Sequence, residues 1–207
     1  MAASFETDLA PSTLDVAVVH VPSLLSDAIP ERSLLTSLWD GFSHLQVPTT
    51  RFGTLEVAPE NILYFAEGII QFLDCKYFAF VFPEPRGPLF WLQSLEIPKI
   101  AFPVMEPCRF LPNYTPTLNE VDKLALGLSV ETPKIYAIVN IPPQNQHLLM
   151  ADLQAPLVIN PATQQGRQCI LHETRWKIRH DLLEAWGNAI KKAPLGTGKP
   201  SKNVLVR

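Results

Sequence analysis

The sequence is poor in the residues that mark several common protein classes. Its three cysteines are an odd number, widely spaced along the chain, and do not suggest a disulfide framework. No run approaches the roughly 20 consecutive apolar residues that a membrane-spanning helix needs. The acidic segment 1–15 also lacks the apolar core of a signal peptide. We therefore expect a cytoplasmic protein without membrane contacts.

The motifs of common enzymes are missing as well. The chain contains no G-x-S-x-G elbow, no Walker A loop, no G-x-G-x-x-G and no H-E-x-x-H. The five histidines fall on separate predicted elements, and Cys169 and His172 would point to opposite faces of a strand. We expect no metal site and no cofactor. Cys108, next to Arg109, is either a reactive thiol or a small packed side chain.

Charge is distributed unevenly along the chain. All 20 acidic residues precede position 191, so residues 1–190, with 12 basic residues, carry a net charge of −8. The remaining residues carry only positive charge, at Lys191, Lys192, Lys199, Lys202 and Arg207. An acidic body repels phosphate backbones and suits a basic protein partner. We expect no direct binding of nucleic acid.

Proline is abundant and divides the chain into short runs. The 20 prolines favour many short strands over long helices. Runs rich in β-branched and aromatic residues predict strands at 15–21, 50–57, 77–82, 88–95, 99–104, 134–141, 155–160 and 167–172. Pro103, inside one run, indicates an edge or bulged strand. The regular spacing of these strands predicts a sandwich or a barrel-like closed sheet.

Three segments have helical patterns, at residues 30–45, 117–127 and 180–192. The first starts with a proline and places Trp39 in an amphipathic stripe. In the second, Thr117 and Glu120 have the spacing of a capping box, and Gly127 is suited to the end of the helix. We expect these helices to be accessory to the strands.

From Thr49 to about Leu182 the chain resembles the FliW family of bacterial flagellar assembly factors. The resemblance rests on several pieces that occur in the family's order and spacing. They are "TTRFGTLEV", "ENILYFAEGIIQF", "FWLQSLEIPKIAFPVMEP", "LPNYTP", "AIVNIP", "ADLQAPLVIN", "GRQCIL" and "RHDL".

The resemblance implies a mainly β fold, a small antiparallel β-barrel-like domain with a few short helices and no catalysis. It also implies two partners, the basic translational regulator CsrA and flagellin. Export of flagellin would free the factor to capture CsrA and restore flagellin translation. Two rivals stay open: a chaperone that holds flagellin without CsrA antagonism, and a small β-barrel enzyme that uses Cys108.

The resemblance divides the chain into three parts. Residues 1–48 form an N-terminal extension with the amphipathic helix, residues 49–182 form the FliW-like β domain, and residues 183–207 form a C-terminal helix and a basic flexible tail. The N-terminal helix would pack on the barrel, mediate self-association or cover the partner surface.

One stretch departs from the family pattern. The family usually has Pro-Glu-Gly followed by a turn like Leu-Pro-Gly-Phe, whereas this chain reads Ala-Glu-Gly-Ile-Ile-Gln-Phe at 66–72. Loss of that proline and glycine leaves the segment free to become helical. We expect the geometry there to differ from the family's.

Trp91 and Gln93 are candidate partner-binding residues. They would share one face of the predicted strand 88–95, because side chains alternate along a strand. If that face is exposed, an aromatic anchor and an amide suit a protein partner. If it is buried, backbone groups must satisfy the amide, since an unpaired buried amide is costly.

Four further candidates lie nearer the end of the β domain. Asp152 and Gln154 precede a predicted strand, where an exposed edge would accept an extended peptide. Arg167 and Gln168 follow a hairpin turn that we predict at Gln165 and Gly166. Each of the four either reaches a partner or is an ordinary turn or surface residue.

Overall fold

A computed structural model describes residues 44–83, 87–130, 132–142, 148–182 and 205–206. The predicted strand 15–21 and nearly all of the predicted helices 30–45 and 180–192 lie outside these ranges. At the end of the first helix prediction, Leu45 instead begins strand β1 (Leu45–Thr49), which crosses the predicted boundary at residue 48. At the start of the other, His180 and Asp181 form strand β11.

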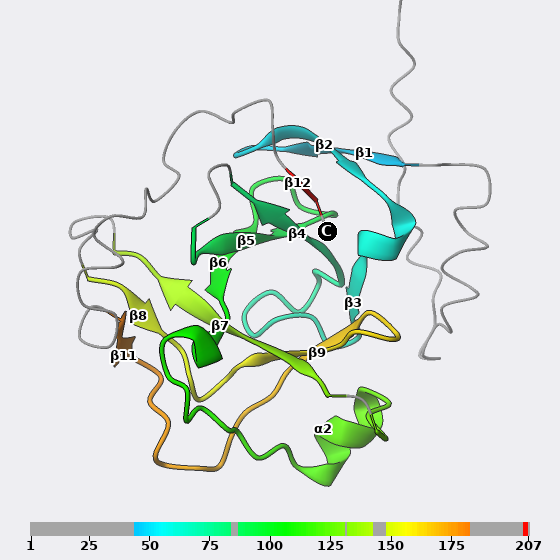
Figure 1. Ribbon diagram of the computed structural model, residues 1–207. Coiled ribbons are helices and arrows are strands. Elements are labelled where there is room, and N and C mark those ends of the chain that lie inside the picture. Colours follow the sequence, from blue (N-terminus) through cyan, green and yellow to red (C-terminus); the bar gives the residue numbers. More distant parts are fainter. Residues whose placement is uncertain (1–43, 84–86, 131, 143–147, 183–204, 207) are drawn as a thin grey trace, which may run out of the picture.

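Seven strands form a closed barrel, in agreement with the predicted fold class (Figure 1). They are β3 (Leu63–Phe65), β4 (Tyr77–Phe82), β5 (Phe90–Ser94), β6 (Ala101–Met105), β7 (Lys134–Asn140), β9 (Leu157–Asn160) and β10 (Gln165–Gln168). The order is β7-β6-β5-β4-β3-β10-β9, and the pairing of β9 with β7 closes the ring. All neighbours are antiparallel except β3 and β10, which are parallel. Closure leaves the ring without an unpaired edge strand.

Smaller strands and helices lie around the barrel. Strands β1 and β2 (Gly53–Val57) form a separate hairpin, β8 (Met150–Ala151) and β11 (His180–Asp181) extend from β7, and β12 (Leu205–Val206) pairs with β4. Two short 3₁₀ helices are η1 (Pro59–Asn61) and η2 (Pro107–Arg109), and α2 spans Glu120–Ala125. None of the described helices is long and apolar enough to span a membrane.

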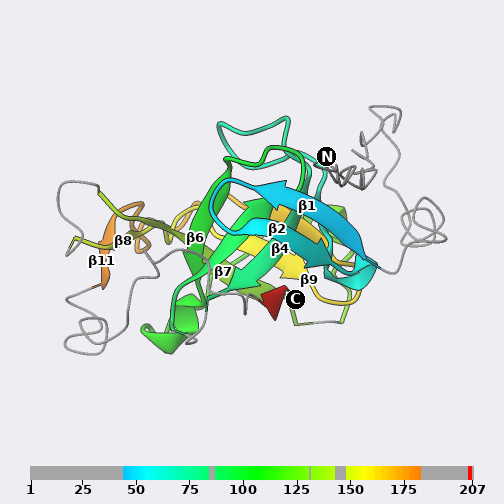
Figure 2. The ribbon, with the colours of Figure 1, turned by 90° about the horizontal axis from the view of Figure 1, so that it is seen from above.

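Strand β4 is buried on both faces, which explains its unbroken apolar sequence. Phe78 and Phe80 point into the barrel, where they contact other aromatic rings. Tyr77, Ala79 and Val81 point the other way, into a second cluster formed with the β1–β2 hairpin. The hairpin lies across the outside of β4 (Figure 1, Figure 2). Because successive side chains of a strand point to opposite faces, β4 contributes residues to two hydrophobic clusters.

Most of the predicted strands that lie in the described ranges are present, with two shifts. The run 50–57 is split, because residues 50–52 form the turn between β1 and β2 and Gly53 has a φ of 71°. The run 167–172 becomes β10 at 165–168. Pro103 lies where β6 pairs with β5 alone, since the registered pairs with β7 start at Val104. That open side accommodates a residue without an N–H group.

The predicted hairpin turn at Gln165 and Gly166 is wrong, because both residues lie inside β10. The turn comes earlier, at 161–164, and Gln164 has a φ of 61°. Gly166 serves a different purpose: a β-carbon there would overlap the ring of Phe65, which is fully buried in the barrel. Its missing side chain allows the close approach of β10 to β3.

The predicted capping box of the second helix is also wrong. Helix α2 starts later than predicted, and its N-cap is Asn119, whose Oδ1 accepts the N–H of Asp122 at 2.7 Å. Its end agrees with the prediction: Gly127 has a φ of 61° and donates its N–H to the Leu124 carbonyl. Leu128 donates to the carbonyl of Lys123, which completes a Schellman motif.

Candidate protein-docking surface

Three surface elements meet at Arg167 on strand β10. Its Nε donates to Oδ1 of Asp122 on helix α2 at 2.7 Å, and its Nη1 donates to Glu67 in the segment that follows β3. Burial disfavours the charge of Arg167, but the hydrogen bonds to Glu67 and Asp122 outweigh it and raise the pKa of the guanidinium. We call α2, the segment 66–74 and the segment 165–170 the α2 surface.

The segment 66–73 forms a tight turn and not a helix, which corrects the expectation from sequence. The N–H of Phe72 donates to the carbonyl of Ile69 at 2.7 Å, and Gln71 has a φ of 71°. Gln71 therefore adopts the conformation that suits the glycine of the family pattern. Gly68, with a φ of 70°, has no room for a β-carbon, because it would lie 2.7 Å from the carbonyl oxygen of Phe72.

Gln168 connects this turn to the barrel. Its Oε1 accepts the N–H of Ile70 at 2.9 Å, and its Nε2 donates to the carbonyl of Ala155 at 3.2 Å. A proline at position 70, as in the family pattern, would have no N–H to donate. The chain thus uses Gln168 to hold a turn that its own sequence stabilises poorly.

The α2 surface exposes an unusual number of large apolar side chains. They are Ile70, Leu73, Val121, Leu124 and Ile170, which are between 45% and 82% exposed. The same segments carry exposed carboxylates, at Glu67, Asp74 and Glu120. Exposed apolar side chains together with acidic ones are typical of a site that binds another protein.

Helix α2 exposes its own apolar residues and buries those that flank it. Val121 and Leu124 are exposed. Leu118 and Leu126, on either side of the helix, are buried in a cluster with Val158, Cys169 and Leu171. Burial in this cluster raises the pKa of the Cys169 thiol to about 12, which makes it an inert packed side chain.

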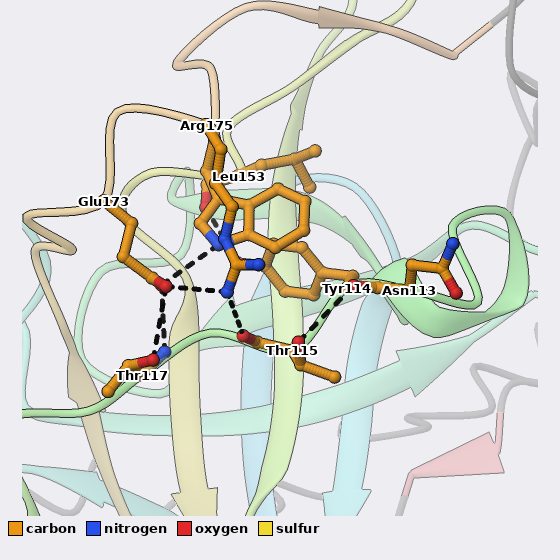
Figure 3. Close-up of polar contacts among 8 residues, drawn as sticks. Asn113, Tyr114, Thr115, Thr117, Leu153, Glu173 and Arg175 are labelled. Carbon is orange, nitrogen blue, oxygen red and sulfur yellow. Dashed lines mark hydrogen bonds and ion pairs between the residues drawn. The ribbon is translucent and has the colours of Figure 1, made fainter.

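The segment before α2 is held at Glu173. This carboxylate accepts the N–H of Thr117 at 3.0 Å, the Thr117 hydroxyl at 3.2 Å and Nε1 of Trp176 at 3.1 Å. Nη2 of Arg175 donates two hydrogen bonds, to Oε1 of Glu173 at 2.7 Å and to the Thr115 carbonyl at 3.1 Å (Figure 3). The Thr117 N–H, with help from Arg175 and Trp176, lowers the pKa of Glu173.

Tyr114 fixes the loop "LPNYTP" to the body of the protein. Its ring is buried against Trp176, with 4.6 Å between ring centroids. Its hydroxyl donates to the Leu153 carbonyl at 2.8 Å (Figure 3). Burial raises the pKa of Tyr114 above its usual value. Together, Tyr114 and Glu173 give α2 a rigid base on the barrel.

Trp91 and Gln93 lie on β5, under the β1–β2 hairpin. Trp91 is half-buried beneath Arg51, 4.1 Å from the ring centroid, and beside Phe52. Gln93 is fully buried, and its Nε2 donates to the carbonyls of Ser94 at 2.8 Å and of Ile100 at 2.9 Å. Gln93 is therefore a core residue with no surface to offer a partner, and its Nε2 is satisfied by backbone carbonyls as expected. Its buried Oε1, in contrast, has no hydrogen-bond partner among the described residues.

Asp152 and Gln154 lie in the connection between β8 and β9. Oδ1 of Asp152 accepts the N–H groups of Gln154 and Ala155, each at 3.0 Å. Burial raises the pKa of the Asp152 carboxyl, although these two hydrogen bonds oppose the shift. The carbonyl of Gln154 accepts the N–H of Leu171 at 2.8 Å, so this edge is already paired with the chain after β10.

Of the six predicted partner-binding residues, two lie on the α2 surface, Arg167 and Gln168. Sequence reasoning missed Glu67, Asp122 and the exposed apolar residues of the α2 surface. The acidic partners of Arg167 are distant in sequence and carry no local signal. An exposed Leu124 has the same helical spacing as a buried one, so the pattern alone could not identify it.

Cys108 lies on η2, exposed, at the wall of a cavity of about 420 Å³. The neighbouring Arg109 donates its Nε–H to Oε2 of Glu106 at 2.6 Å. The described residues that line this cavity include no histidine. Among the residues that the structure describes, no group of three or more His, Cys, Asp or Glu side chains is placed to hold a metal ion.

Comparison with known proteins gives one consistent result. The family model described as "FliW protein" matches residues 46–182. A flagellar assembly factor FliW from Bdellovibrio bacteriovorus is 38% identical over 66% of this chain and 78% of its own length. One from Moorella thermoacetica is also 38% identical, over 68% and 89%. A crystal structure of the flagellar assembly factor FliW superposes with a TM-score of 0.61 at 29% identity, covering 67% of this chain and 96% of that one.

Proposed function

The chain belongs to the FliW family of flagellar assembly factors, and we propose that it works in the cytoplasm as a non-enzymatic antagonist of the translational regulator CsrA. In this proposal it also binds flagellin, and exchange between the two partners couples export of flagellin to its translation. The matched range and the resemblance of the sequence blocks support the proposal.

The observation that carries the proposal on this molecule is the α2 surface. Five exposed apolar side chains and the exposed carboxylates of Glu67, Asp74 and Glu120 belong to segments that Arg167 and Gln168 connect. Apolar contacts supply binding energy, and the carboxylates favour a basic partner over an acidic one. CsrA, as an RNA-binding regulator, is such a basic partner.

The test is titration calorimetry of the whole chain with purified CsrA and, separately, with purified flagellin. We expect Leu124→Asp to weaken CsrA binding at least tenfold, because it places a charge in the apolar part of the surface. Leu124 is 82% exposed, so the substitution leaves the fold intact. Ile178→Asp is the matched control, since Ile178 is 61% exposed and lies outside the α2 surface.

Each outcome decides between the alternatives. Binding of flagellin without binding of CsrA at micromolar concentration would favour the flagellin-holding chaperone. Equal losses in the Leu124→Asp and Ile178→Asp variants would place the binding site elsewhere. Simultaneous binding of both partners to one molecule would overturn partner exchange.

A further inference from the structure

The cavity beside η2, which we call the η2 cavity, lies where one barrel strand begins. η2 follows β6 and packs against β7, the strand that pairs with β6. The wall of the cavity comes from residues 106–108, Tyr114 and residues 132–136. Its volume of about 420 Å³ falls within the range of about 300 to 1,000 Å³ that is usual for sites that hold small molecules.

Tyr136 on β7 presents a hydroxyl without a protein partner to this cavity. The residue is only 7% exposed, and its ring packs inside the barrel against Phe80, with 4.8 Å between ring centroids. The hydroxyl makes no hydrogen bond with the residues that the structure describes, and it is not sealed inside the protein. It is therefore accessible from the cavity that Tyr136 lines. Tyrosine hydroxyls on side chains as buried as this one usually have a partner.

The electrostatic surroundings of Tyr136 show which side of the cavity its hydroxyl faces. Burial raises the pKa of Tyr136 to about 12; the charge of Glu106 adds to the shift, and Arg109 opposes it. Glu106 is the N-cap of η2 and Arg109 is its last residue, so the hydroxyl lies toward η2. It keeps its proton at neutral pH and can donate a hydrogen bond to a ligand.

Two side chains of opposite charge also line the η2 cavity. Glu106 accepts the N–H of Arg109 through Oε2, and its Oε1 has no hydrogen bond to a described residue. Lys134, at the start of β7, is exposed and forms no ion pair with the described carboxylates. The cavity thus offers one carboxylate oxygen as an acceptor and one ammonium group as a donor. This combination suits a ligand that carries both charges.

The rest of the wall is apolar and stiff. Pro107 and Tyr114 are buried, and the Tyr114 hydroxyl is fixed by the Leu153 carbonyl. Pro133 and Ile135, both partly exposed, complete this part of the wall. Proline rings and strand side chains lose little conformational freedom when a ligand binds, so the cavity is largely formed in advance.

We propose that the η2 cavity binds a small zwitterion with an apolar body, of the chemical class of a free amino acid with an apolar side chain. Its carboxylate accepts hydrogen bonds from Lys134 and from the Tyr136 hydroxyl, and its ammonium group donates to Oε1 of Glu106. Its side chain lies against the apolar wall. The described residues that line the cavity include none of the α2 surface, so this site does not depend on the proposed function.

The thiol of Cys108, on the cavity wall, reports binding in the full chain. Cys75 and Cys169 are buried, so Cys108 is the thiol that iodoacetamide reaches. The probes are L-leucine, L-phenylalanine and L-tryptophan, and we expect the best of them to bind with a Kd of about 1 mM, because a molecule of this size makes few contacts. At about 10 mM it should slow the alkylation of Cys108 about tenfold.

The charge requirement is tested with derivatives of the same three amino acids. The amides lack the carboxylate, and the N-acetyl forms lack the ammonium group. Each derivative should bind at least about tenfold more weakly than its parent, because it leaves one charged group of the cavity without its partner. Equal protection of Cys108 by parent and derivatives would overturn the assignment of a zwitterion.

Two variants test the residues that we assign to the ligand. Tyr136→Phe removes only the hydroxyl and keeps the ring in the barrel, and Lys134→Gln removes only the charge; each should raise the Kd about tenfold. Lys99→Gln is the matched control, since Lys99 is exposed and does not line the cavity. The alkylation rate of each variant without a probe is its own reference, and urea denaturation checks that each variant is folded.

Two results would overturn the site itself. One is the absence of protection of Cys108 by all three amino acids at about 20 mM, well above the expected Kd. The other is an equal Kd for wild type, Tyr136→Phe and Lys134→Gln, which would place the binding elsewhere on the protein.

Discussion

Gly166 shows how a single residue can be required by its surroundings. The ring of Phe65 occupies the space of the missing side chain. We predict that Gly166→Ala lowers the free energy of unfolding by about 3 kcal/mol, because overpacking in a closed barrel forces the ring or the strand to move. Urea denaturation measures the loss. Gly87→Ala is the control: its nearest neighbour is 4.0 Å away, and a loss as large as that of Gly166→Ala would contradict the packing argument.

At the same scale, the buried carboxyl of Asp152 predicts how the stability of the protein depends on pH. Burial raises the pKa of its carboxyl in the folded state, so the charged form costs stability as pH rises through that pKa. Asn keeps the Oδ1 acceptor for the N–H groups of Gln154 and Ala155 without the charge. Asp152→Asn should therefore be more stable than wild type at about pH 7, and the difference should vanish at about pH 3, below the ordinary Asp pKa.

That comparison needs denaturation curves at both pH values. A stability gain that is the same at both would show that charge burial is not its cause. A loss at neutral pH would show that the carboxylate, and not merely an acceptor oxygen, is needed by the turn.

At the scale of the elements, Arg167 joins α2 to the segment 66–73. Arg167→Ala would leave the buried carboxylate of Asp122 without this cation, which should cost about 2 kcal/mol of stability. Lys123→Ala is the control, because the Lys123–Glu120 pair is exposed and should be worth less than about 0.5 kcal/mol. Thermal or urea unfolding gives both values, and equal losses would argue against a special role of Arg167.

The turn at 69–72 also allows a prediction about stability. Gln71 is held at a φ of 71°, which costs a non-glycine residue about 1 kcal/mol. Gln71→Gly should gain about that much stability in urea denaturation, whereas Gln71→Ala keeps the unfavourable backbone and should gain nothing. A gain in both variants would assign the effect to the lost side chain.

For the whole molecule, charge predicts how binding responds to salt. Residues 1–190 carry a net charge of −8, and the carboxylates of the α2 surface add a local field. If CsrA binds there, its association rate should fall about tenfold or more between roughly 0.02 M and 0.3 M salt, while the dissociation rate changes little. Stopped-flow fluorescence measures both rates. A rate independent of salt would exclude electrostatic steering.

Strand prediction succeeded where burial leaves a local signal. Strand β4 is apolar throughout because two cores cover it, so the run 77–82 could be recognised from residue type alone. Strand β3 was missed, since its three residues are extended only through pairing with β4 and β10. The parallel pairing of β3 with β10 joins distant segments, and periodicity carries no information about it.

Site prediction was limited by the same lack of long-range information. Arg167 and Gln168 stay predicted partner-binding residues, and their contacts Glu67 and Ile70 lie 100 and 98 residues away in the chain. Gln93 was a candidate because an amide in an apolar run is unusual. Only its carbonyl partners at Ser94 and Ile100 explain its burial.

The sequence by itself determined the family, the mainly β class, most strands and the position where helix α2 ends, because these depend on local residue types and on ordered motifs. The tertiary structure decided which apolar residues stay exposed, how Arg167 joins the α2 surface, and that β12 covers the end of β4. These features arise from contacts between residues far apart in the chain, and no local pattern encodes the free energy of such contacts.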